Sequence, residues 1–134
     1  MPPFVFRFDS DEPIDEQACV VRIGPDVATR EQLFQHYRAK LGLPDYFGEN
    51  WDALDEALRD LHWVKPKRVV IEHEGMPRLS EKELRTYLTI LARAVEDWTR
   101  DADQHEVAVV FPADAQLRVL GLLKAEASEA APGS

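Results

Sequence analysis

The residues best suited to chemistry or binding are concentrated between positions 41 and 64. This stretch holds six carboxylates and a single arginine or lysine, Arg59, together with four large aromatic side chains. Carboxylates in such a setting can bind a metal ion, act as general acids or bases, or pair with the cations of a partner protein. Which of these three roles applies depends on the helices, strands or loops that position the carboxylates. The aromatic residues are Tyr46, Phe47, Trp51 and Trp63.

A short helix is expected from about Trp51 to Leu61, with Asn50 as its N-cap. A helical period places the apolar residues on one side and the acidic residues on the other, toward solvent or a partner. The acids at 52, 56 and 60 repel one another, and only the first is near the favourable end of the helix dipole. Such a row of acids is most often only a solvated surface. Because the later acids have no local reason in folding, the row is also consistent with selection for function. The apolar set is Leu54, Ala57, Leu58 and Leu61, and the acidic set is Asp52, Asp55, Glu56 and Asp60.

An enzymatic interpretation uses the same acids. Asp52, Asp55 and Glu56 would hold Mg²⁺ in a phosphotransfer or hydrolytic site, with His62 or His73 as the base. This is disfavoured because a helix spreads these acids over an outer face and because no glycine-rich phosphate loop accompanies them. The histidines are scattered, without metal-ligand spacing. The sequence therefore predicts no catalytic residue, no metal site and no cofactor.

The charge and cysteine content of the whole chain limit the classes of partner and the cellular compartments that suit it. There are 25 acidic against 16 basic side chains, a formal charge of −9, which disfavours nucleic acid and favours a basic protein. The only cysteine, Cys19, excludes an internal disulfide and fits a reducing compartment. There is no signal-peptide pattern and no long apolar run, so we expect a cytoplasmic protein that does not enter a membrane and is monomeric when free.

Periodicity along the 134 residues indicates one α/β domain with a mainly parallel sheet, because strands separated by helices need crossover connections. Alternating phenylalanines near the N-terminus predict a short edge strand within an extension covering residues 1–17. Residues 18–112 form the expected domain body. A C-terminal segment follows at 113–134, with a short helix and a disordered tail of about the last ten residues. The body is expected to contain strands at 18–23, 69–72 and 107–111, and helices from Thr29 to about Leu41, Trp51 to Leu61 and Ser80 to about Trp98.

The segment from Leu43 to Leu54, LPDYFGENWDAL, resembles the signature of the barstar family of ribonuclease inhibitors. The order of strands and helices from Ala18 to Phe111 is also similar to that family. The resemblance implies a small, mainly parallel three-stranded sheet packed with helices, to which the N-terminal edge strand would be added. It further implies an intracellular inhibitor, in the role of an immunity protein or antitoxin, that blocks the basic active site of a barnase-like ribonuclease or ribonuclease toxin. A barstar-like scaffold with a different basic partner is the alternative.

The resemblance also assigns residues to the partner-binding face. Asp52 and Glu56 are the key pair, whose carboxylates would take the place of substrate phosphates. The chain departs from the family in having Glu56 where aspartate is usual, Phe47 where tyrosine is usual, and Asp55 where an aromatic or apolar residue is usual. An acid on the long helix would also contribute, and either Glu96 or Asp97 matches it, of which Glu96 is included in the set. The complete set is Tyr46, Phe47, Gly48, Asn50, Trp51, Asp52, Asp55, Glu56, Trp63 and Glu96.

Overall fold

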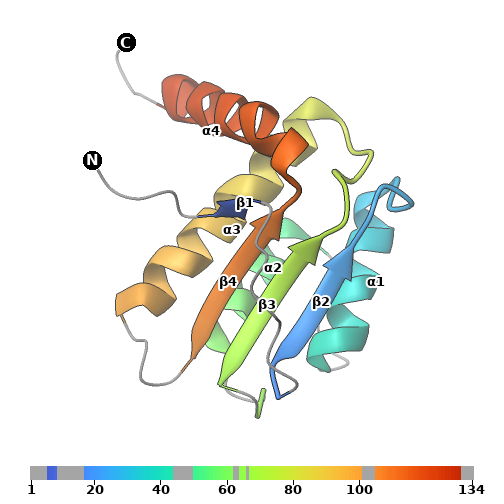
Figure 1. Cartoon of the computed structure of the whole chain (residues 1–134), viewed down its shortest axis with the longest axis vertical. Coiled ribbons are helices and arrows are strands. Elements are labelled where there is room, and N and C mark those ends of the chain that lie inside the picture. The colour runs from blue at the N-terminus through green and yellow to red at the C-terminus, as the bar shows by residue number, and fades with distance from the viewer. Residues whose placement is uncertain are drawn as a thin grey trace.

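Four parallel strands form a single sheet in the computed structural model, in the order β1-β4-β3-β2 (Figure 1). The structure describes residues 6–8, 17–43, 50–61, 64–65, 67–100 and 105–130, without the side chains of 125–130. The expected α/β class, parallel sheet and N-terminal edge strand are therefore confirmed. The strands are β1 (Arg7–Phe8), β2 (Cys19–Ile23), β3 (Arg68–His73) and β4 (Glu106–Phe111), and the helices are α1 (Arg30–Leu41), α2 (Trp51–Asp60), α3 (Glu81–Arg100), η1 (Ala113–Ala115) and α4 (Gln116–Ala130).

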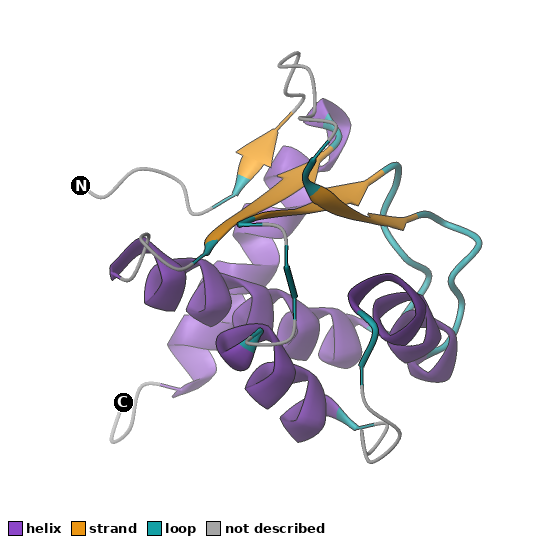
Figure 2. Cartoon of the chain, turned by 90° about the horizontal axis from the view of Figure 1, so that it is seen from below, coloured by secondary structure: helices purple, strands orange, loops and turns teal. Residues whose placement is uncertain are grey.

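The sheet supplies one wall of the core. Val21, Ile71 and Val109 lie opposite one another on β2, β3 and β4, and all three are fully buried. Helices α1 and α2 lie in the connection from β2 to β3, and α3 lies in the connection from β3 to β4. Figure 2 shows α1, α2 and α3 on the same side of the sheet, as right-handed crossovers between successive parallel strands require. The apolar faces of these helices and of the sheet therefore share one core.

The edge strand β1 is shorter than the alternating phenylalanines suggest, but it is held by their side chains. It pairs with β4 through Arg7 opposite Val110 and Phe8 opposite Phe111. The rings of Phe6 and Phe8 lie 5.2 and 6.1 Å from the ring of Phe111. Burial of aromatic rings against β4 thus compensates for a ladder of only two residues.

Helix α1 has the boundaries that its capping residues predict. The hydroxyl oxygen of Thr29 accepts a hydrogen bond from the backbone N–H of Gln32 at 3.2 Å. At the other end Gly42 adopts a left-handed conformation, with φ of 64°, and its N–H bonds to the carbonyl of Arg38. Glycine takes this conformation without a side-chain clash, which explains why the helix ends here.

Helix α3 begins at the expected capping box. Ser80 accepts from the backbone N–H of Glu83 at 3.1 Å, and its hydroxyl donates to the Glu83 carboxylate at 3.3 Å. The helix continues through Trp98 to Arg100. Among the described residues, no helix has the length and apolar content needed to cross a membrane.

Helix α4 corrects the expectation of a disordered tail. That tail was expected to begin near residue 126, yet α4 continues to Ala130. The sequence from 125 to 130, AEASEA, is rich in strong helix formers, and α4 also packs against α3. High intrinsic propensity, in a helix that already begins at Gln116, therefore outweighs the polar composition. Residues 131–134 lie outside the described residues.

A chain of buried hydrogen bonds crosses the core from α1 to β4. The hydroxyls of Tyr37 and Tyr87 are 2.6 Å apart, Tyr87 is 2.8 Å from Nε2 of His73, and Nδ1 of His73 is 2.9 Å from the carbonyl oxygen of Val110. A carbonyl only accepts, so the Nδ1–H of His73 donates to it and Nε2 accepts from Tyr87. Tyr87 in turn accepts from Tyr37. The direction of all three bonds follows from a neutral imidazole.

Burial keeps His73 neutral. Its side chain is stacked on Phe111, with the ring centroids 4.0 Å apart, and desolvation lowers its pKa from 6.5 to about 4. Desolvation likewise raises the pKa values of both tyrosines, so both remain protonated near neutral pH.

We predict that His73 makes the fold sensitive to mild acid. Between pH of about 6.5 and about 4 the unfolded chain binds a proton that the folded chain excludes. The stabilising contribution of neutral His73 is therefore fully present above a pH of about 6.5. It is lost as the pH falls toward about 4, and the total loss is on the order of 3 kcal/mol. The free energy of unfolding, measured by urea titration at several pH values, should decrease for the wild type from pH 7 to 5.5. His73→Gln should lack this part of the slope, and equal slopes for the two proteins would contradict the assignment.

Candidate protein-binding site

Helix α2 begins where its sequence predicts. The side-chain oxygen of Asn50 accepts from the backbone N–H of Ala53 at 2.8 Å, which caps the helix. Asp52 lies in the first turn, where the positive end of the helix dipole favours a carboxylate. The first acid of the site is thus fixed by a defined helix start.

The two sides of α2 have opposite character. Leu54, Ala57 and Leu58 are buried in the core, and Leu61, which ends the helix with φ of 52°, is buried as well. Asp52, Glu56 and Asp60 are exposed on the other side. The expected amphipathic helix is therefore confirmed for these residues, and three carboxylates form an outward row. We call Asp52, Glu56 and Asp60 the acidic row.

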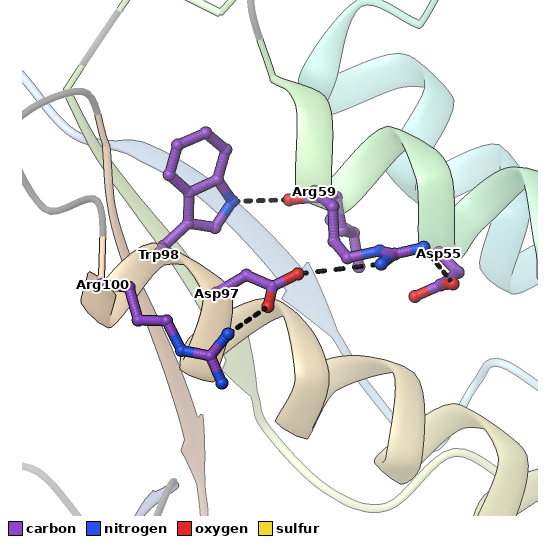
Figure 3. A network of polar contacts seen from close by, with 6 residues as sticks. Asp55, Arg59, Asp97, Trp98 and Arg100 are labelled. Atoms are coloured by element: carbon purple, nitrogen blue, oxygen red, sulfur yellow. Dashed lines mark hydrogen bonds and ion pairs between the residues drawn. The ribbon is translucent and has the colours of Figure 1, made fainter.

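Asp55 does not belong to the acidic row, which corrects the expectation that four acids share the outer face. Its side chain is only 17% exposed and points along the flank of α2 toward α3 (Figure 3). One carboxylate oxygen accepts from Nη2 of Arg59 at 3.0 Å, and the other is buried without a hydrogen-bond partner. Around the axis of α2, Asp55 lies about 100° from the centre of the apolar stripe, and α3 covers this side of the helix.

The contact between α2 and α3 is both polar and apolar. The indole N–H of Trp98 donates to the carbonyl of Leu58 at 2.7 Å (Figure 3). The indole also packs edge-on against His105. On the same side Nη1 of Arg59 lies 3.8 Å from Asp97. Sequence reasoning placed Trp98 on an apolar stripe but missed its bond to α2. The spacing of Asp55 and Arg59, four residues apart, was an available signal for their ion pair.

Trp51 lies at the border between core and surface. It is partly buried, with its ring 5.1 Å from that of Phe34 and 6.2 Å from that of Tyr87. The contacts with Phe34 and Tyr87 give Trp51 a packing role at the edge of the core. They also connect the start of α2 to the buried chain of hydrogen bonds, since Tyr87 belongs to both.

The structure favours Asp97 over Glu96 as the acid that α3 places beside α2. Glu96 is exposed, whereas Asp97 reaches Arg59 on α2 and also lies 3.9 Å from Arg100. The remaining partner-binding predictions fall on Tyr46, Phe47, Gly48 and Trp63, which lie outside the described residues. Among predicted site residues that are described, Asn50, Trp51, Asp52, Asp55 and Glu56 are gathered on α2 and its cap.

The magnesium hypothesis gains no support from this arrangement. Asp55 is engaged by Arg59, and His73 is enclosed in the core. In the part of the chain that the structure describes, no three His, Cys, Asp or Glu side chains gather closely enough to hold a metal ion. The site offers exposed carboxylates on a fixed helix, which are suited to pairing with cations of another protein.

Fold and site together define a small parallel α/β protein that presents an acidic row on a helix docked against its core. A family model described as Barstar (barnase inhibitor) matches residues 18–112. The chain therefore belongs to the barstar family, which is a family of inhibitors. No curated protein sequence matches the chain.

We predict that neighbouring positions on α2 differ sharply in their effect on stability. Leu54 is fully buried, so Leu54→Ala should lower the free energy of unfolding by about 2–5 kcal/mol through lost burial and the cavity that remains. Glu56→Ala removes an exposed acid from a repelling row and should change it by less than about 0.5 kcal/mol. Chemical denaturation of both variants checks this. A large loss for Glu56→Ala would show that this side chain has a structural role.

Proposed function

We propose that the chain inhibits a basic ribonuclease by covering its active site with the acidic row of α2. Asp52 and Glu56 enter the site and occupy the positions of substrate phosphates. The arginine, lysine and histidine side chains that stabilise phosphate charge in the nuclease then form charge-assisted hydrogen bonds with these carboxylates. RNA is excluded because its binding groups are already paired and its path is blocked.

The observation that carries the proposal is the exposure of Asp52 and Glu56 on a helix whose opposite face is buried. Such a helix loses little conformational entropy on binding, because its backbone and cap are already ordered. Membership of an inhibitor family and the formal charge of −9 support the same function. From the family resemblance, Asn50, Trp51, Tyr46, Phe47, Gly48 and Trp63 are proposed to surround the two acids.

One predicted contact residue, Asp55, is not kept in this proposal. The Asp55 side chain is only 17% exposed and pairs with Arg59, whereas Glu96 is exposed on α3 and stays among the proposed contacts. Glu56 remains, and its side chain is one methylene longer than the aspartate usual in the family. We therefore propose a cognate nuclease with a slightly deeper pocket. A chain in this role acts as an antitoxin in the cytoplasm of the cell that makes the nuclease.

We predict stoichiometric inhibition of at least one enzyme in a panel of small basic ribonucleases that includes barnase. Asp52→Asn combined with Glu56→Gln should weaken binding by about 2–5 kcal/mol, a range typical of charge pairs broken at such interfaces, and should leave unfolding nearly unchanged. Titration calorimetry and an RNA cleavage assay measure both effects. Absence of inhibition across the panel, or equal binding by the double variant, would contradict the proposal.

Salt should act mainly on the rate of association. Attraction between the acidic row and a basic cleft steers the encounter, and ions screen this attraction beyond about 8 Å at physiological ionic strength. Stopped-flow measurements with an inhibited nuclease should show association slowing by at least about tenfold between 0.02 and 0.5 M salt, with a smaller change in dissociation. Association that does not depend on salt would point to an apolar interface elsewhere on the chain.

A further inference from the structure

The charge pattern changes at the border where the face that carries the acidic row meets α3. Arg59, Asp97 and Arg100 follow one another there, with Arg59 3.8 Å and Arg100 3.9 Å from the carboxylate of Asp97 (Figure 3). The side chain of Arg59 is 45% exposed and that of Arg100 is 79% exposed. The border therefore presents two cations around one partly covered anion, beside a row of three anions.

Arg59 is held at this border by ion pairs with two acids. Its Nη2 donates to Asp55 at 3.0 Å, and Asp55 is enclosed with one oxygen that has no hydrogen-bond partner. Enclosing a carboxylate in this way has a cost in desolvation, which the arginine offsets. An unattached surface arginine can swing away from an approaching cation, whereas this guanidinium is held at the border by two acids.

A partner that is basic over its whole contact surface would gain no attraction at this border, because Arg59 and Arg100 offset the charges of Asp55 and Asp97. Charge patterns that reject incorrect partners are a common source of specificity at protein interfaces. Building on the proposed function, we propose that the cognate ribonuclease carries an acidic side chain at the rim of its basic cleft, and that this side chain pairs with Arg59. The acidic row binds the cations of the cleft, and Arg59 selects nucleases with a carboxylate at the adjoining rim.

The alternative is that Arg59 only ties α2 to α3 and makes no contact with the partner. The two roles predict opposite effects on binding when the charge of Arg59 is removed. A purely structural arginine still contributes a positive charge close to a basic partner, so its removal should speed association. An arginine that pairs with a partner carboxylate should instead weaken the complex when it is neutralised.

Arg118 provides a matched control for the loss of one positive charge. It is an exposed arginine on α4, beside Glu81 at the first residue of α3. Asp97 is sixteen residues farther along α3, roughly 24 Å away at the helical rise. Arg118→Gln changes the net charge as Arg59→Gln does, but outside the proposed interface.

The experiment measures association and dissociation rates with an inhibited ribonuclease from the panel. Arg59→Gln should weaken binding by about three- to tenfold, mainly through faster dissociation, whereas Arg118→Gln should leave dissociation unchanged and speed association by up to about twofold. Because Arg59→Gln strands the enclosed Asp55, the double variant Asp55→Asn/Arg59→Gln is measured beside it and should weaken binding to a similar extent. Unfolding curves verify that each variant is folded under the binding conditions.

Each outcome separates the two proposals. If the wild type binds the nuclease and both Arg59 variants bind as tightly or more tightly, the partner has no carboxylate there, and the role of Arg59 is overturned while the inhibitory function stands. If the wild type binds no ribonuclease in the panel, the proposed function fails and the assignment of Arg59 falls with it. Weakening by both Arg59 variants, without a matching effect of Arg118→Gln, supports the pairing.

Discussion

The docking of α2 on α3 is the contact on which the acidic face depends. Leu54 and Leu58 are fully buried, and Trp98 donates its indole N–H to the carbonyl of Leu58. Burying two leucine side chains contributes on the order of 3–6 kcal/mol relative to exposing them, far more than the few tenths by which like charges on the outer side repel. The core therefore fixes the orientation of α2, and its outer positions are left available to carry negative charge.

This division explains how one short helix can serve both folding and binding. Its inner face is constrained by the packing of Leu54, Ala57 and Leu58, while Asp52 and Glu56 are exposed. The flank between the two faces is neither core nor free surface. There Asp55 and Arg59 form an ion pair that adjusts α2 to its neighbour and sets the charge at the edge of the proposed interface.

The sequence predicts those features that arise from local rules. Capping by Thr29, Asn50 and Ser80 locates three helix starts, and valine-rich segments locate the three longer strands. Features that depend on tertiary neighbours are less accessible. The position of Asp55 depends on α3 covering one flank of α2, and the chain from Tyr37 to His73 joins residues 36 positions apart through Tyr87.

The central claim is that the acidic row of α2 occupies the phosphate-binding site of a ribonuclease. The most direct measurement is the mode of inhibition, determined from initial rates of RNA cleavage at several concentrations of substrate and inhibitor. The account predicts competition: the apparent inhibition constant should rise linearly with the RNA concentration, and a nucleotide bound in the active site should prevent the complex from forming. Inhibition that is independent of RNA concentration, or a complex that forms while the active site is filled, would contradict it.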